Sequence, residues 1–215
     1  DLALHTVRSQ MLGRGMSLTE ATAHIAQHMG IQHTIAPMSD DPVRTIVHCD
    51  QGDLAFQHYF VRERCEPKVS GFSFSGIHQA RLNPLLKSWL NDCDGVIICP
   101  SNPFVSVDPL LQLDGFGEAL KNLPVVAVSP IVGGIAIKGP AAKMLQEMNM
   151  PATAVAVANH YQGLIDGFVV DAEDKKLIEQ INVPTISTPS VMVTLQHRID
   201  LAKACVDFLM TLSAP

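Results

Sequence analysis

From Gly95 onward, short apolar runs rich in β-branched residues alternate with stretches that carry apolar residues at helical spacing. We expect strands at 95–99, 125–128, 153–157, 167–170 and 183–187, and helices around 108–122, 139–149, 158–165, 173–180 and 191–211. Strands buried on both faces have continuous apolar runs, and parallel strands need long crossover connections that are usually helical. The alternation therefore predicts an α/β fold with a Rossmann-like, mostly parallel sheet and helices on both of its faces.

The opening part of the chain has a different pattern. Apolar residues recur at helical spacing from Leu2 to Leu12, and Ser17 with Glu20 forms a capping box that introduces a second helix ending near Gly30. Strands are expected at 34–37 and 44–49, a turn at 51–53, a hairpin partner over 54–61, and a helix beginning at 84. We predict a small α+β lobe over residues 1–68 and a parallel α/β domain over 69–215, packed as one compact unit.

Composition excludes several classes of partner. The 215 residues carry a net charge of -6, and the basic residues are scattered singly, so neither nucleic acid nor a membrane surface is an expected partner. No apolar run approaches the roughly 18 residues of a membrane span, and we see no signal peptide. The five cysteines are odd in number and form no C-x-x-C pair, which predicts a reducing, cytoplasmic setting.

Polar residues follow the expected strands. The run 95–98 ends in a loop that contains Ser101, Asn102 and Ser106, and the run 125–128 ends at Ser129. Open parallel sheets bind ligands beyond the carboxyl ends of their strands, so these residues are expected to line a site. None of the serines lies in a G-x-S-x-G elbow, so we expect them to orient a ligand rather than act as nucleophiles.

The loop after Ser129 contains Gly133 and Gly134 and then Lys138, followed by a predicted helix. Backbone N–H groups and one cation could converge there on an anion such as a diphosphate. The pattern matches neither the P-loop nor the G-x-G-x-x-G motif, and a glycine-permitted turn with Lys138 in solvent explains it equally well.

Two adjacent carboxylates, Asp40 and Asp41, precede Arg44 in the motif 39–44. Paired carboxylates can hold Mg²⁺ and an arginine can grip phosphate oxygens, which are parts needed for phosphoryl transfer. The alternative, an Asp-Pro turn with a surface ion pair, is favoured when this motif is considered alone.

Other titratable residues carry weaker signals. Asp171 and Asp174 fit helix caps and turns better than site carboxylates. His160 is of interest because its segment is expected to face the crevice, and Cys99 fits a buried structural thiol at a strand end.

Taken together, three motifs resemble the 2-phospho-L-lactate transferase family, which acts in the biosynthesis of the deazaflavin coenzyme F-420. They span residues 37–45, 99–106 and 129–140, and further matches extend the resemblance over nearly the whole chain. The resemblance implies transfer of a phospholactyl group from a guanosine-diphosphate-linked donor to the ribityl hydroxyl of 7,8-didemethyl-8-hydroxy-5-deazariboflavin, with release of GMP and use of Mg²⁺. Bacterial relatives use a phosphoenolpyruvyl donor.

The resemblance also implies roles for single residues. Lys138 and Arg44 would meet phosphate charge, Gly133 and Gly134 would allow close backbone approach, and Asp40 or Asp41 would assist the metal or the attacking hydroxyl. The remaining ligand-binding positions that it implies are His5, Ser101, Asn102, Ser106 and Ser129.

Family members begin with a strand and a glycine-rich nucleotide loop, which this sequence lacks. We therefore expect the chain to be the C-terminal part of the enzyme, with the main metal ligands in the missing segment and the parent protein as the active form. A homodimer is left open. The alternatives are a nucleotide-sugar-binding regulator of the related gluconeogenesis-factor family, whose loop has Gly-Pro-Gly-Ser where this chain has Pro100-Ser101-Asn102-Pro103, and a non-functional remnant.

Overall fold

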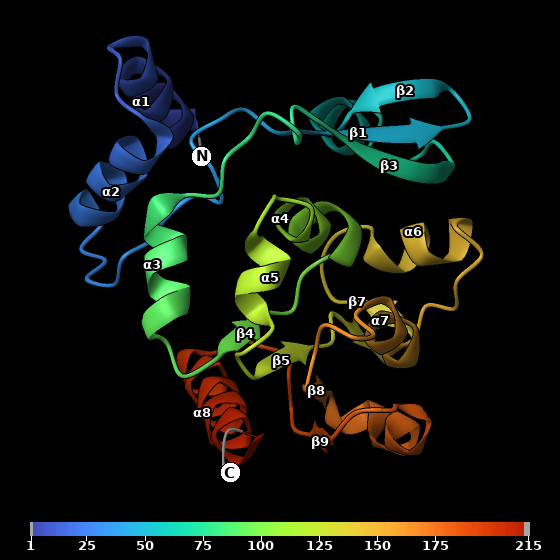
Figure 1. Ribbon diagram of the computed structural model, residues 1–215. Helices are drawn as coiled ribbons and strands as arrows, with labels where there is room; N and C mark the ends of the chain where they lie inside the picture. Colours follow the sequence, from blue (N-terminus) through green and yellow to red (C-terminus); the bar gives the residue numbers. More distant parts are fainter. Residues whose placement is uncertain (1, 213–215) are drawn as a thin grey trace.

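The structure is a computed structural model that describes residues 2–212 (Figure 1). Its strands form a four-stranded sheet, a three-stranded sheet and a two-stranded hairpin. The strands are β1 (Arg44–Cys49), β2 (Gly52–Ala55), β3 (Val69–Ser75), β4 (Val96–Ile98), β5 (Val125–Val128), β6 (Ile131–Val132), β7 (Ile135–Ala136), β8 (Gly167–Val170) and β9 (Thr185–Ser187).

Eight α-helices and three shorter or irregular helices accompany these strands in the described part of the chain. The α-helices are α1 (Leu2–Gly13), α2 (Leu18–His28), α3 (Pro84–Asp92), α4 (Asp108–Leu111), α5 (Phe116–Leu120), α6 (Ala141–Glu147), α7 (Ala154–His160) and α8 (Leu195–Leu212). The others are the π-helical turns η1 (His58–Arg62) and η2 (Pro103–Val107) and the 3-10 helix η3 (Ala172–Gln180).

The main sheet has the order β4-β5-β8-β9, and all three of its strand pairs are parallel. Its register pairs Val96 with Val125 and Phe168 with Thr185. The predicted α/β class is confirmed, as are four of the five strands predicted from apolar runs.

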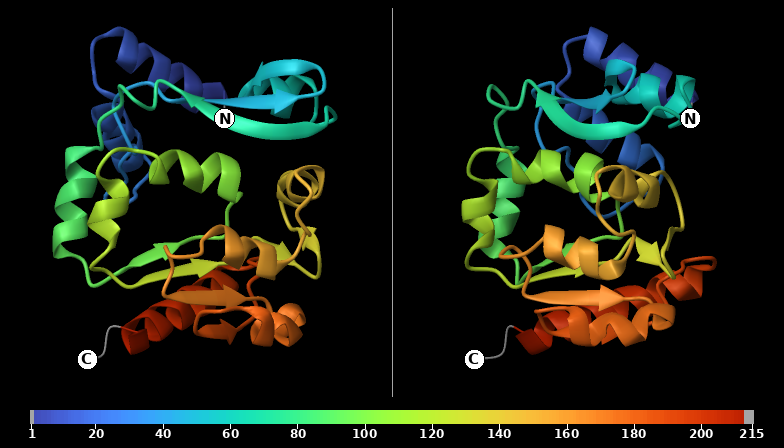
Figure 2. Two further views of the ribbon diagram at one scale, coloured as in Figure 1. Left: turned by 45° about the vertical axis from the view of Figure 1, so that its right-hand side comes forward. Right: turned by 90° about the vertical axis from the view of Figure 1, so that its right-hand side faces the viewer.

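Helices cover both faces of this sheet. On one face, alternate residues such as Val125 and Phe168 join a large core with α5, α6 and α7. On the other face, Val126, Val128 and Val169 pack against α8. Figure 2 shows the red helix α8 beneath the sheet, with α5 and α6 on the opposite side.

Three of the predicted elements of this domain differ. Residues 153–157 were expected to be a strand and 158–165 a helix, whereas the helix α7 spans Ala154–His160. The side chain of Thr153 caps α7 by accepting a hydrogen bond from the N–H of Ala156 at 3.2 Å. The predicted helix over 108–122 is broken into α4 and α5, because Gly115 has a positive φ of 80°.

The small lobe contains the antiparallel sheet β2-β1-β3. Residues 34–37, predicted as a strand, lie outside regular structure, and the expected hairpin partner over 54–61 ends at Ala55 and turns into η1. β3 pairs with β1 along its length, so this sheet continues past the boundary predicted at residue 68, and the division into two domains stays a prediction.

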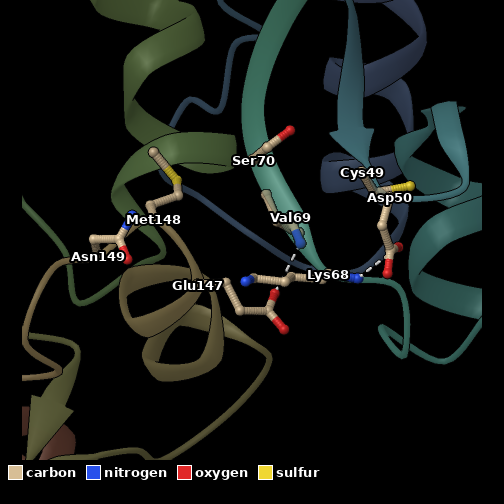
Figure 3. Close-up of a pocket in the computed structure, with 8 residues that line it drawn as sticks. All are labelled: Cys49, Asp50, Lys68, Val69, Ser70, Glu147, Met148 and Asn149. Carbon is tan, nitrogen blue, oxygen red and sulfur yellow. Dashed lines mark hydrogen bonds between the residues drawn. The ribbon is translucent and has the colours of Figure 1, made fainter.

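A carboxylate on α6 joins the small lobe to the main domain. Glu147 accepts a hydrogen bond from the N–H of Val69 at 2.9 Å (Figure 3). It is also ion-paired with Lys143, which donates to the carbonyl of Pro67 at 3.0 Å. A cavity of about 470 Å³ lies beside this junction, between the ends of β1 and α6. The small lobe is therefore hydrogen-bonded to α6, the helix that follows the loop with Lys138.

Candidate functional site

A crevice of about 260 Å³ lies beyond the carboxyl ends of β4, β5 and β9. Its lining comes from the three loops that follow these strands. The lining residues are Pro100, Ser101, Asn102, Ser129, Pro130, Val132, Ile137, Lys138, Ser190, Val191, Met192 and Val193. The structure therefore brings together four residues that the sequence predicted as ligand-binding: Ser101, Asn102, Ser129 and Lys138.

Two of these four side chains form hydrogen bonds within the protein. Asn102 caps η2 by accepting from the N–H of Phe104 at 3.1 Å, and its amide group donates to the sulfur of Met144 on α6. The buried hydroxyl of Ser129 donates to the carbonyl of Ile131 at 2.8 Å. Asn102 and Ser129 therefore shape the crevice, whereas Ser101 is half-buried and Lys138 is exposed, so both reach the solvent in it.

The glycine loop is the turn of the hairpin β6–β7. Gly133 and Gly134 have positive φ values of 57° and 82°, which suit a tight hairpin turn. The N–H of Gly133 donates to Oδ2 of Asp174 at 3.0 Å, so it faces a carboxylate. This geometry favours the glycine-permitted turn over an anion cradle at Gly133, and it leaves Lys138 as the anion-binding candidate of the loop.

The motif 39–44 lies in the small lobe, in a separate cavity of about 530 Å³ that also contains Arg8 and Leu12 of α1. Oδ1 of Asp40 accepts from the N–H and the hydroxyl of Thr19 at 2.7 and 2.8 Å. Oδ2 of Asp41 accepts from the N–H of Arg81 at 2.9 Å. Both carboxylates thus hold the start of α2 and the segment before α3, and Arg44 lines the same cavity rather than the crevice.

The sequence also predicted Asp40 and Asp41 as ligands of Mg²⁺. Within residues 2–212, no group of three or more His, Cys, Asp or Glu side chains could hold a metal ion. Asp40 and Asp41 each use an oxygen in hydrogen bonds to neighbouring segments. The roles of Asp40 and Asp41 as metal ligands stay predictions.

Two further predicted ligand-binding residues, His5 and Ser106, also lie outside the lining of the crevice. His5 is exposed on α1, and its Nδ1 lies 3.2 Å from the guanidinium of Arg8. Ser106 is exposed in η2, where its N–H donates to the carbonyl of Asn102. Their ligand-binding roles stay predictions.

His160 packs between elements of the main domain. Its Nε2 lies 2.8 Å from Oδ1 of Asp108, and its ring contacts Phe104 and Tyr161 edge to face. Burial and the charge of Asp108 raise the pKa of Tyr161. The contact between His160 and Asp108 joins α7 to α4.

Sequence reasoning missed Ser190, which forms part of the crevice wall. Its N–H and hydroxyl donate to Oδ2 of Asp171 at 2.7 and 2.8 Å. Burial raises the pKa of Asp171, but hydrogen bonds from the N–H groups of Glu173, Ser190 and Ala172 and from the Ser190 hydroxyl outweigh it and lower that pKa overall. The sequence signal for this contact was Asp171, which directly follows a buried strand and stands in the capping position before a helix.

A parallel sheet with helices on both faces and a polar crevice at its carboxyl edge defines a Rossmann-like α/β protein, a class that binds phosphate-bearing ligands at this edge. The solved structure of a UPF0052 family member from Bacillus halodurans has the same fold. Its TM-score is 0.66 at 15% sequence identity, and the match covers 94% of this chain and 70% of that one.

The chain belongs to the 2-phospho-L-lactate transferase CofD family, whose model matches residues 1–201. The 2-phospho-L-lactate transferases of Methanosarcina barkeri and Methanosarcina acetivorans are 34% and 36% identical to it, and the chain spans 71% and 70% of their lengths, with 100% and 98% of this chain covered. A phosphoenolpyruvate transferase from Streptomyces griseus is 33% identical over 96% of this chain and 68% of its own. The family expected from the sequence motifs is confirmed, and with it a transferase.

Within residues 2–212, no helix is long and apolar enough to cross a membrane.

Proposed function

We propose that this protein transfers a phospholactyl or phosphoenolpyruvyl group from a guanosine-diphosphate-linked donor to the ribityl hydroxyl of a deazaflavin, with release of GMP. The observation that carries the proposal is Lys138 at a crevice beyond the carboxyl ends of the parallel strands, beside Ser101. The names of the relatives support the class of reaction, and they differ over the transferred group.

The residues of the crevice would stabilise charge on the diphosphate and hold the donor in position. The ribityl hydroxyl would attack the phosphorus that bears the lactyl or enolpyruvyl group and lose its proton to water. The bond from that phosphorus to the bridging oxygen would break, and GMP would leave with the electron pair. The ammonium group of Lys138 would stabilise the charge that develops on the diphosphate. Ser101 would donate a hydrogen bond to the donor, and the rigid loop around Asn102 and Ser129 would hold that donor in line for attack.

Use of Mg²⁺ belongs to the same proposal. Mg²⁺ is commonly held by one or two carboxylates together with substrate phosphates, so it would supply charge stabilisation on the diphosphate when bound. The proposal predicts that a chelator abolishes the reaction and that excess Mg²⁺ restores it.

The test is a reaction with the protein expressed from its complete reading frame. The deazaflavin is incubated with the phospholactyl or the phosphoenolpyruvyl donor in Mg²⁺, and GMP is quantified by chromatography while the product is identified by mass. We expect GMP and phosphorylated deazaflavin in equal amounts with one donor, and no GMP when the deazaflavin is omitted. Absence of GMP release with both donors contradicts the proposed function.

A further inference from the structure

Two buried carboxylates of one segment hold two different walls of the crevice. Asp171, which is 5% exposed, directly follows β8, and its Oδ2 accepts both hydrogen bonds from Ser190. Ser190 is 6% exposed and begins the wall that continues through Val191 and Met192. This contact crosses 19 residues of sequence and fixes the loop between β9 and α8.

Asp174 makes the matching contact to the other wall. It is 7% exposed, and its Oδ2 accepts from the N–H of Gly133 across 41 residues of sequence. Gly133 is the turn residue of the hairpin that leads to Ile137 and Lys138, both of which line the crevice.

The two carboxylates are tied to each other. The N–H of Asp174 donates to the carbonyl of Asp171 at 3.0 Å, and Oδ1 of Asp171 caps the same turn of η3 by accepting from the N–H of Glu173. The spacing between the two walls is therefore set by one rigid turn. A side chain at Gly133 would also press on this turn, because its Cβ would lie 3.0 Å from a carboxylate oxygen of Glu173.

We propose that Asp171 and Asp174 are positioning residues that set the width of the crevice between Ser190 and Lys138, and with it the affinity for the diphosphate of the donor. Neither carboxylate lines the crevice, so both act through the backbone that they hold. The inference rests on the proposed function, because it takes the diphosphate-bearing donor as the ligand of the crevice.

The test compares Asp174→Ala with Asp174→Asn, since asparagine keeps an oxygen that can accept from the N–H of Gly133 and alanine does not. Guanosine diphosphate is the binding probe, and its dissociation constant is measured by calorimetry alongside donor KM and kcat. We expect Asp174→Ala to raise the dissociation constant and KM about tenfold, because the hairpin that leads to Lys138 loses a contact that holds it in place, with kcat within about twofold of the original protein. Asp174→Asn is expected to restore most of the affinity.

Controls separate positioning from general damage. Asp207→Ala removes an exposed carboxylate of α8 and should change neither constant. Ser190→Ala removes one of the two hydrogen bonds to Asp171 while leaving the backbone bond, and should weaken binding about threefold even where Asp171→Ala fails to fold.

Unchanged dissociation constant and KM in Asp174→Ala and Ser190→Ala would overturn the inference while leaving the proposed function intact. If the original protein neither binds guanosine diphosphate nor releases GMP, the proposed function fails and the inference falls with it. Equal loss of kcat in Asp174→Ala and Asp174→Asn also contradicts a positioning role.

Discussion

Lys138 is the cation of the crevice lining, and its side chain is exposed to the ligand space. Under the proposed function, replacing it with alanine would remove a charge-assisted contact to phosphate, and such a contact contributes about 1.5–3 kcal/mol. We therefore expect Lys138→Ala to raise donor KM at least tenfold, measured from initial rates of GMP release. Lys121→Ala is the matched control, because Lys121 is an exposed lysine paired with Glu118 at 2.6 Å. Donor kinetics that stay the same in Lys138→Ala would exclude the phosphate contact.

The lowered pKa of Asp171 makes a second prediction, on stability. A carboxyl group whose pKa is lower in the folded than in the unfolded state stabilises the fold above the unfolded-state pKa of about 3.9, and this contribution is lost as the pH falls through the folded-state pKa. The difference in free energy of unfolding between the protein and Asp171→Asn should therefore be constant near neutral pH and shrink below about pH 4. Urea titrations at pH 7, 5, 4 and 3 measure it, and a difference independent of pH argues against the ionised hydrogen-bonded carboxylate.

Single residues also show what the sequence could predict of the site. Ser101, Asn102 and Ser129 follow the ends of parallel strands, and the geometry of parallel sheets brings such positions together. Lys138 reaches the crevice from the antiparallel hairpin β6–β7. The contact that fixes Ser190 in the wall was not predicted, because it joins Ser190 to a carboxylate 19 residues away. Partners at such separations leave no local pattern in a sequence.

Among the elements, α7 shows how a local pattern misleads. The run Ala154-Val155-Ala156-Val157 alternates small and β-branched residues, which suggested a strand. Instead, the parallel pairing of β5 with β8 requires a crossover, and the capped, alanine-rich segment provides its helix. By contrast, the capping box of Ser17 and Glu20 forms as predicted, because both of its hydrogen bonds are local.

At the scale of elements, we predict how much the junction between α6 and the small lobe contributes to stability. The side chains of Glu147 and Lys143 are 18% and 34% exposed, and Glu147 also accepts from the N–H of Val69. In Glu147, Oε1 pairs with Lys143 and Oε2 accepts from the N–H of Val69. Glu147→Gln removes the charge and replaces one of these two oxygens with an amide nitrogen, which cannot accept a hydrogen bond. We expect a loss of about 1–2 kcal/mol in the free energy of unfolding from urea titration.

The control for this prediction is Glu118→Gln, in which the exposed pair with Lys121 is broken. An exposed pair contributes about 0–1 kcal/mol, so Glu118→Gln should lower the free energy of unfolding by less than Glu147→Gln does. Equal effects of the two substitutions would show that the junction adds nothing beyond a surface ion pair.

At the scale of the whole molecule, the hydrophobic core runs through both parts of the chain. One continuous cluster contains Val47 and Phe74 of the small lobe together with Met144 and Phe168 of the α/β part. The polar junction between Glu147 and Val69 lies at the same boundary. Small lobe and main sheet therefore share the apolar burial that stabilises them, which favours one cooperative unit over two independent ones.

This shared core predicts a single unfolding transition. The chain has one tryptophan, Trp89, which is half-buried in α3, so tryptophan fluorescence reports on the surroundings of that helix. Far-UV circular dichroism reports on all helices and strands. In urea, the two signals should give the same midpoint and the same slope, because no part loses its structure while the other keeps its core. A circular dichroism transition that precedes the fluorescence change by a separate step would instead mean that the small lobe and the α/β part unfold independently, and the crevice would then have to be rigid without the junction at α6.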